Sequence, residues 1–202
     1  MDMAKNTAAE KKSPVWVIAK IIRVITVPPV MALVAFLSFL TVEGFYKNVW
    51  ECIAAVCFIA LFPILAYPLS VVIPPFKGRD GQRNLAFIMC NVGYILGVLY
   101  AIIFKAGKPV TVMLITYLLS GVTLLLINKL FRFKASGHGC GLVGPLAALV
   151  YFVNIWCLPF GITLAALALW SSVYMKRHTA AQFAVGSAIP VFWLIVVGAF
   201  ML

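Results

Sequence analysis

The sequence predicts an all-α protein, a polytopic bundle of transmembrane helices, and three observations support this fold class. Of the 202 residues, 64% are hydrophobic, whereas soluble domains contain about half apolar residues. Several apolar runs approach ~20 residues, the length of helix needed to cross a hydrocarbon core ~30 Å thick. The short alternating segments typical of a transmembrane β-barrel are absent from the sequence.

Hydropathy divides the chain into seven apolar segments that are long enough, or nearly so, to cross the membrane. Six of them are expected to form the core of the bundle, and the first is an additional N-terminal span. The expected spans are residues 24–42, 48–73, 85–104, 109–128, 139–157, 159–175 and 180–202.

The N-terminal residues 1–23 are expected to form a basic tail and then an amphipathic lead-in helix over 14–23, lying at the membrane interface. No small-residue cleavage site follows the basic residues, so the first apolar segment is expected to remain in the membrane. Pro28 and Pro29 predict a break near the start of the first span. Residues 24–202 then form a single transmembrane domain.

Polar residues are concentrated in three of the connections between spans, at 74–84, 129–138 and 176–179. These connections follow the second, fourth and sixth spans, so they are predicted to emerge on the same face of the membrane. The remaining connections are short and carry little chemistry. One shared site on the polar face is the simplest interpretation.

The net charge of +11 is also unevenly distributed. Of the 16 Lys and Arg residues, only Lys47, Lys105 and Lys108 fall on the other face. The positive-inside rule therefore predicts that the polar face is cytoplasmic, and we expect an integral protein of a bacterial inner (cell) membrane. The charge favours anionic headgroups of the lipid bilayer or phosphate as partners. No nucleic acid is expected, because the chain has no basic soluble domain.

Acidic residues are scarce, and their scarcity excludes several reaction classes. The five are Asp2, Glu10, Glu43, Glu51 and Asp80. A magnesium-dependent phosphotransferase needs carboxylates around its hard cation, and a two-carboxylate hydrolase needs a pair. A proton-coupled pump usually carries acids within its spans. We therefore expect no metal and no cofactor, with chemistry carried by histidine, hydroxyl and cationic groups.

The chain has two histidines, and each lies in one of the polar connections. His138 belongs to the run Ser136-Gly137-His138-Gly139, which opens a helix, where backbone N–H groups and the helix dipole favour an anion. A flexible turn with an exposed histidine is the alternative. His178 lies four residues before Gln182, so both share one helix face, and the amide can fix the tautomer of the ring. An interface anchor of Lys176, Arg177 and His178 is the alternative there.

The first connection is cationic and contains glycine. It reads Lys77-Gly78-Arg79-Asp80-Gly81-Gln82-Arg83-Asn84. Arginine offers a planar donor fork and lysine a point charge, so the loop can clamp a phosphate. A positively charged loop that only anchors the topology is the alternative.

Together the three clusters resemble the type-2 phosphatidic acid phosphatase superfamily, whose members are integral-membrane lipid phosphatases. That family carries Lys-x6-Arg-Pro, then Pro-Ser-Gly-His, then Ser-Arg-x5-His-x3-Asp. Here the second block is Ala135-Ser136-Gly137-His138, and the third is Ser171-Ser172-x5-His178-x3-Gln182. The resemblance covers about residues 74–190, and the order and one-sided placement of the blocks also match.

The chain departs from the family pattern at several positions. Lys77 and Arg83 are separated by five residues rather than six, and Asn84 replaces the proline. Ser172 stands where the family has a phosphate-binding arginine, and Gln182 where it has the aspartate behind the nucleophile. A neutral amide stabilises an imidazolium less than a carboxylate does. We therefore expect lower turnover, or compensation by a cation such as Arg79, Lys176 or Arg177.

The resemblance implies a metal-independent hydrolysis of a terminal phosphate or diphosphate from a membrane lipid. His178 would attack phosphorus to form a phosphohistidine, His138 would act as acid and then base, and Gln182 would orient His178. Phosphate would be bound by cationic, hydroxyl and backbone N–H groups, at Lys77, Arg83, Ser136, Gly137, Ser172 and Arg177. The candidate substrates are phosphatidic acid, phosphatidylglycerol phosphate, polyprenyl diphosphate and phosphorylated lipid A.

Three other functions remain open from the sequence. An intramembrane serine protease would use Ser136 with a histidine, although Lys134 stands where its Gly-x-Ser-Gly turn has glycine. A non-catalytic lipid-phosphate binder or flippase would retain the scaffold without turnover. A small channel or transporter would use the asparagines within the spans, which more often form interhelical hydrogen bonds.

Overall fold

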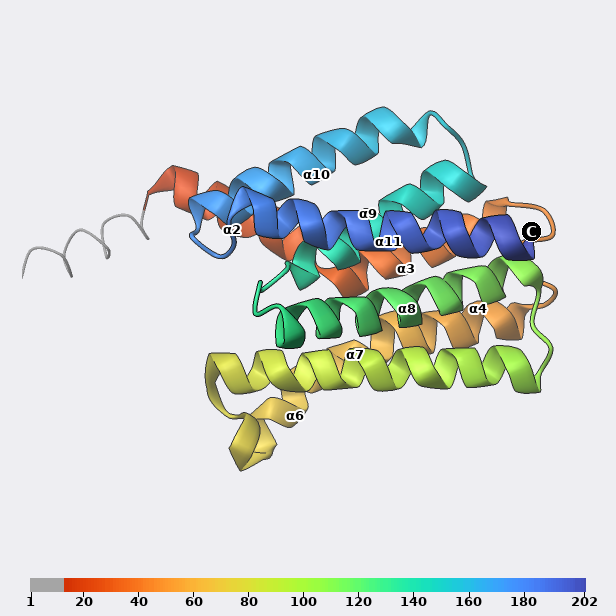
Figure 1. Cartoon of the computed structure of the whole chain (residues 1–202), viewed down its shortest axis with the longest axis horizontal. Helices are drawn as coiled ribbons and strands as arrows, with labels where there is room; N and C mark the ends of the chain where they lie inside the picture. The colour runs from red at the N-terminus through yellow and green to blue at the C-terminus, as the bar shows by residue number, and fades with distance from the viewer. Residues whose placement is uncertain (1–12) are drawn as a thin grey trace, which may run out of the picture.

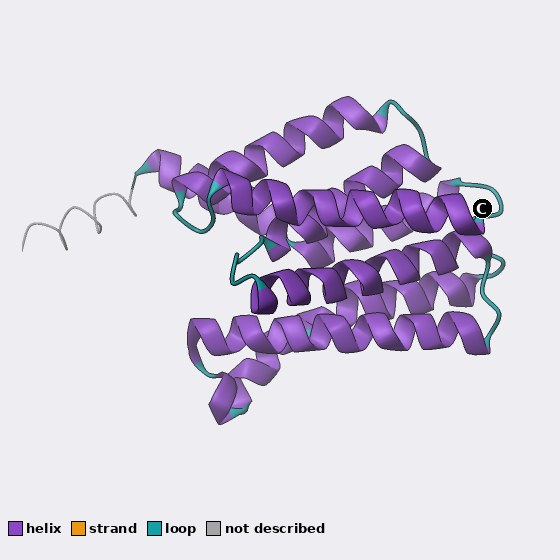
Figure 2. Ribbon diagram, in the orientation of Figure 1, coloured by secondary structure: helices purple, strands orange, loops and turns teal. Residues whose placement is uncertain are grey.

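The computed structural model describes residues 13–202, and in this part of the chain every regular element is a helix (Figures 1 and 2). The basic tail expected over residues 1–12 lies outside the described residues. The long helices lie side by side with their axes roughly aligned. They are α2 (Pro14–Ile25), α3 (Pro28–Ser38), α7 (Gly78–Ile103), α8 (Lys108–Leu130), α9 (Gly137–Phe152), α10 (Cys157–Tyr174) and α11 (Ala180–Met201).

Five segments are long and apolar enough to cross a membrane, namely Val49–Val72, Asp80–Ile103, Lys108–Leu130, Cys157–Tyr174 and Ala180–Met201. A sixth crossing is formed if α2 and the following apolar stretch, Pro28–Thr41, count as one broken span, bent by 49°. The span expected over residues 139–157 is not among them: this segment forms the shorter helix α9, which packs against α3 and α11. The described chain is therefore an all-α, multi-pass membrane protein, which confirms the predicted fold class.

The N-terminal span is divided, as Pro28 and Pro29 predict. The helix is interrupted at Thr26 and Val27, between α2 and α3. Val27 is extended (φ −63°, ψ 142°), the conformation to which a following proline restricts a residue. The lead-in helix expected over residues 14–23 is present as α2, and it contacts α10.

The second span, residues 49–72, is irregular along its length. It consists of α4 (Val49–Ala55), a π-helical segment η2 (Val56–Leu61), α5 (Phe62–Ile64) and α6 (Ala66–Val72). Pro63 has no N–H group to continue an α-helical ladder, and π-helical turns are one way for a helix to accommodate such a position. The short 3₁₀ helix η3 (Pro74–Phe76) then leads into α7.

The two ends of the bundle differ in chemistry. At one end, η1 (Phe39–Thr41) and the following loop contribute to a cluster of aromatic rings, in which the centroids of Phe39 and Phe45 are 4.2 Å apart. There the buried Glu51 accepts hydrogen bonds from the backbone N–H groups of Lys47 and Gly107, at 3.0 and 2.9 Å. This end is closed by packing, whereas the other end carries the polar connections.

Close helix packing positions the polar end. Gly186 of α11 lies against the backbone of Ser136, and a Cβ at this position would overlap the Ser136 carbonyl. The Ser136 N–H donates to the Gln182 carbonyl at 2.9 Å. Gly141 of α9 similarly lies against Pro28, where a Cβ would overlap the proline ring. These contacts hold the starts of α3, α9 and α11 together.

Candidate active site

The three polar connections lie at the same end of the bundle, on the left in Figure 1. They are residues 73–77 between α6 and α7, 131–136 between α8 and α9, and 175–179 between α10 and α11. The first is shorter than the loop expected over 74–84, because residues 78–84 form the first turns of α7. The connections at 42–48, 104–107 and 153–156 lie at the opposite end. The prediction that alternate connections share one face is therefore confirmed.

A cavity of about 780 Å³ opens among these connections and is lined by both histidines. Its wall also carries five cationic residues and, within the described part of the chain, no acidic one. The cations are Arg23, Arg83, Lys129, Lys134 and Arg177. Positive charge on a partly desolvated wall favours an anionic ligand.

His138 is held by a hydrogen bond that the sequence did not suggest. Its Nε2 atom is 3.0 Å from the Oγ1 atom of Thr26, a residue with no exposed surface. The Thr26 hydroxyl donates its own proton to the Ile22 carbonyl at 2.7 Å, so its oxygen is left to accept from the ring. This arrangement assigns the proton to Nε2 and leaves the lone pair on Nδ1 of His138.

His178 lies in the loop before α11 and is half-buried. Burial lowers its pKa below the ordinary value, because a charged imidazolium is poorly solvated there. The nearby Gln182 side chain and the Lys134 backbone act in the opposite direction, while Arg23 and Arg83 add to the lowering. The net effect favours the neutral ring, which is the nucleophilic form.

Gln182 makes hydrogen bonds that the sequence did not suggest. Its Oε1 atom accepts from the Thr179 N–H at 3.1 Å, and the Thr179 hydroxyl accepts from the Gln182 N–H at 3.2 Å, which forms a capping box. Its Nε2 atom donates to the Phe133 carbonyl at 3.2 Å. The buried Nδ1 atom of His178 has no hydrogen-bond partner among the described residues. Gln182 therefore ties two connections together, and its side chain also lies close enough to His178 to raise the pKa of the ring.

The other expected phosphate-binding residues divide into two groups. Arg83, Gly137 and Arg177 lie on the cavity wall. Lys77, Ser136 and Ser172 do not line it among the described residues: Lys77 is exposed before α7, and both serines are fully buried.

The position of Ser136 has a local cause. Its hydroxyl accepts from the Gly139 N–H at 3.1 Å and caps α9, the usual role of a serine before a helix. Because the hydroxyl is buried and engaged, the geometry also disfavours the serine-protease interpretation. The Oγ atom of Ser172 has no hydrogen-bond partner among the described residues.

Sequence reasoning placed Arg23 at the membrane interface and did not connect it with the histidines. In the structure, α2 packs along α10, where the Ser171 hydroxyl donates to the Ala19 carbonyl at 2.7 Å. This contact brings Arg23 to the cavity wall, close enough to lower the pKa of His178. Of the cations expected to compensate for Ser172, Arg177 lines the cavity, Lys176 does not, and the Arg79 side chain lies outside the described part of the structure.

Comparisons of the chain with protein-family models, with curated proteins and with solved structures find no match. The chemistry of this site therefore rests on the residues described above.

Proposed function

We propose that the protein hydrolyses a terminal phosphate or diphosphate from a membrane lipid through a phosphohistidine, without a metal ion. The observation that carries the proposal is the meeting of His138 and His178 on one cavity wall with five cations and no acidic side chain among the described lining residues. Two histidines supply a nucleophile and an acid–base group, and the cations supply charge for a phosphoryl group.

In the first step, a ring nitrogen of His178 forms a bond to phosphorus as the bond from phosphorus to the lipid oxygen breaks. Before this step, the Nδ1 atom of His138 takes up a proton from solvent beside the anionic phosphate, and it then gives this proton to the leaving oxygen. In the second step, His138 takes a proton from water, whose oxygen displaces His178 from phosphorus and releases phosphate. The lowered pKa of His178 supports its role as nucleophile, because the ring must be neutral to attack.

Arginine side chains are proposed to bind the phosphoryl oxygens. Arg83 and Arg177 were expected in this role, and Arg23 joins them from α2. Arg23 and Arg177 together replace the cation that is missing at Ser172. The Nε atom of Arg177 is buried and has no hydrogen-bond partner among the described residues, so it can donate to a ligand at little cost.

The lipid would lie with its phosphate among the polar connections and its tail between the spans. Phosphatidic acid, phosphatidylglycerol phosphate, polyprenyl diphosphate and lipid A type phosphates are the candidate substrates. The excess of Lys and Arg on this face supports a cytoplasmic active site in a bacterial inner membrane.

The test is phosphate release by purified protein in detergent, with EDTA present, against a panel of these lipids. H178A and H138A are expected to lose release, and R83A is expected to lower it. K77A is the matched control, because Lys77 is an exposed cation that does not line the cavity. Turnover by H178A at the wild-type rate would refute the proposal.

A non-catalytic lipid-phosphate binder on the same scaffold is the second candidate. It is favoured by the unpartnered Nδ1 atom of His178 and by the neutral side chain of Gln182, because a carboxylate would orient the ring and stabilise an imidazolium more strongly. Binding of lipid phosphates with no release from any of them would establish this alternative.

A further inference from the structure

The cavity extends from the histidines into the membrane-spanning part of the bundle. On α8 its lining residues recur every three or four positions from Asn128 to Thr116, which is one face of the helix. Asn128 lies near the polar end, because its amide donates to the Ala135 carbonyl at 3.4 Å. Twelve residues of α-helix separate Asn128 from Thr116, a rise of about 18 Å.

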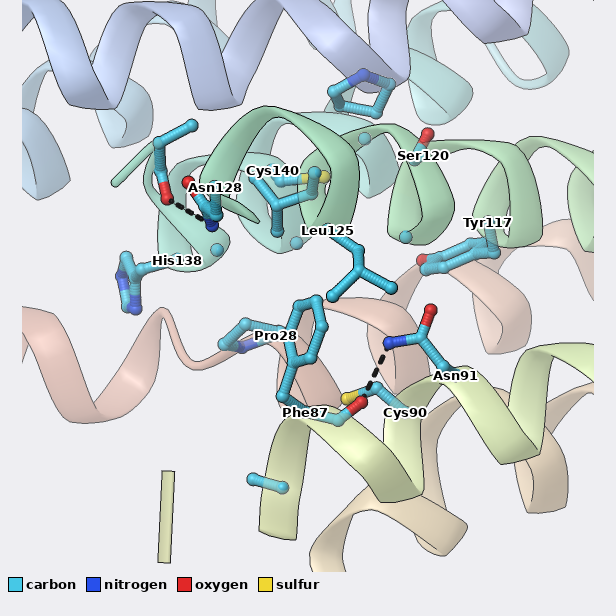
Figure 3. Close-up of a pocket in the computed structure, with 18 of the residues that line it drawn as sticks. Pro28, Phe87, Cys90, Asn91, Tyr117, Ser120, Leu125, Asn128, His138 and Cys140 are labelled. Carbon is cyan, nitrogen blue, oxygen red and sulfur yellow. Dashed lines mark hydrogen bonds between the residues drawn. The ribbon is translucent and has the colours of Figure 1, made fainter. Parts of the chain in front are cut away.

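The lining changes character along this length. Near the histidines it is cationic, and beyond them Phe87, Leu124 and Leu125 are apolar. At the far end the lining becomes polar again, with Asn91 and Tyr94 from α7 and Thr116, Tyr117 and Ser120 from α8. Figure 3 shows His138 and Tyr117 at opposite ends of the labelled residues, with Phe87 and Leu125 between them.

Three hydroxyl groups at the far end lack partners. Thr116 and Ser120 are each only 4% exposed, and neither hydroxyl has a hydrogen-bond partner among the described residues. The Tyr117 hydroxyl is likewise buried and unpartnered. A buried hydroxyl without a partner is costly, so this cluster is a set of groups available to a ligand.

Several hydroxyls elsewhere in the described residues donate to the carbonyl four residues earlier, as such residues commonly do. Examples are Thr26, Ser38, Thr111 and Thr163, at 2.7–2.9 Å. Thr116 and Ser120 lie on helix α8 but do not form this bond. Both also line the cavity, so their hydroxyl groups are available to a ligand there.

We propose that Asn91, Thr116, Tyr117 and Ser120 form a distal subsite for an oxygen-bearing group on the apolar tail of the ligand. Asn91 donates to the Phe87 carbonyl at 2.8 Å, so its amide oxygen remains an acceptor. The inference rests on the proposed function, in which the phosphate binds among the cations. The ligand class is then a lipid phosphate whose tail carries a hydroxyl or carbonyl group, such as a hydroxylated acyl chain.

Specificity follows from the cost of leaving the subsite unpaired. Water can satisfy these hydroxyls before the ligand binds. A purely hydrocarbon tail, such as a polyprenyl chain, would displace that water and return no hydrogen bond. Sites built to bond a ligand hydroxyl discriminate strongly against the analogue that lacks it. We therefore expect oxygen-bearing tails to be preferred over hydrocarbon tails.

The test uses alkyl phosphonates, which bind but are not hydrolysed, in a series with one hydroxyl placed at successive chain positions. Affinity is measured by titration calorimetry with purified protein in detergent. The best hydroxylated probe is expected to bind about fivefold more tightly than the plain chain, the factor contributed by a typical hydrogen bond. T116V, Y117F and S120A preserve side-chain volume, and together they are expected to abolish the preference.

T163V is the matched control, because it removes a hydroxyl from the exposed face of α10, and it should retain the preference. Equal affinity for every probe in the wild-type protein, or a preference that survives in the triple variant, would overturn the subsite. Because the probes are not hydrolysed, the result is independent of turnover. A retained hydroxyl preference without phosphate release from any lipid would refute the phosphatase and leave the subsite standing.

Discussion

The hydrogen bond from His138 to Thr26 can be removed with little change in volume by the substitution T26V. Valine keeps the shape of the threonine side chain but offers no oxygen to the ring Nε2–H, which lies 3.0 Å from that oxygen in the structure. T26S retains the oxygen and is the matched control. In the T26V variant, we expect His138 to lose its preference for the tautomer that carries the proton on Nε2.

The expected magnitude follows from the geometry. The bond is made in a buried setting between two neutral groups, and such bonds contribute about 1 kcal/mol net. Its loss corresponds to roughly a fivefold change in the tautomer ratio. A similar loss in kcat is expected if Nδ1 of His138 carries the transferred proton, because a smaller fraction of the rings then has the productive form.

The assay is nitrogen NMR of protein labelled at histidine, in which only two residues contribute because the chain has two histidines. H178A assigns the remaining signals to His138. Wild-type protein and T26S should show a protonated Nε2 and an unprotonated Nδ1, and T26V should show a mixture. An unchanged tautomer and unchanged kcat in T26V would refute the inference that Thr26 sets the state of the ring.

Two further predictions follow from the site and its packing. The lowered pKa of His178 means that its ring stays neutral below the ordinary histidine value of about 6.5, so the acidic limb of kcat/KM should lie below that pH. R83A removes a cation that lowers the pKa of His178, so this variant should show the acidic limb at higher pH. An acidic limb above about pH 6.5 in the wild-type protein would contradict the role of His178 as the neutral nucleophile. G186A should destabilise the protein in a thermal unfolding assay, because the added Cβ overlaps the backbone before α9. G137A is its control, since a Cβ there meets only the Leu124 side chain at 3.6 Å, and equal loss of stability in both variants would refute the packing argument.

Most of the spans, and the end of the bundle at which the polar connections meet, could be predicted from the sequence because they depend on local properties. Apolar length must match the thickness of the bilayer, and alternate connections then emerge on the same side. The placement of the connections predicted four residues that do line one cavity: His138, His178, Arg83 and Arg177. The roles of individual hydroxyl and amide groups could not be predicted in the same way. The unpaired backbone groups at the ends of helices bind the same side chains that could bind a ligand or a histidine. Gln182 was expected to orient His178, and the sequence did not suggest that it also caps α11 and holds the neighbouring connection.

Arg23 and Thr26 show why the remainder of the site could not be predicted. Both lie at the end of α2, far in sequence from the histidine connections, and three separate contacts bring them there. Val27 is extended before Pro28, the Pro28 ring lies against Gly141 of α9, and Ser171 holds the α2 backbone from α10. A proline, a glycine and a serine are each common in membrane helices, so none identifies the contact alone. Their combined effect is to bend the first span at the point where a hydroxyl can reach His138 and a guanidinium can face the cavity.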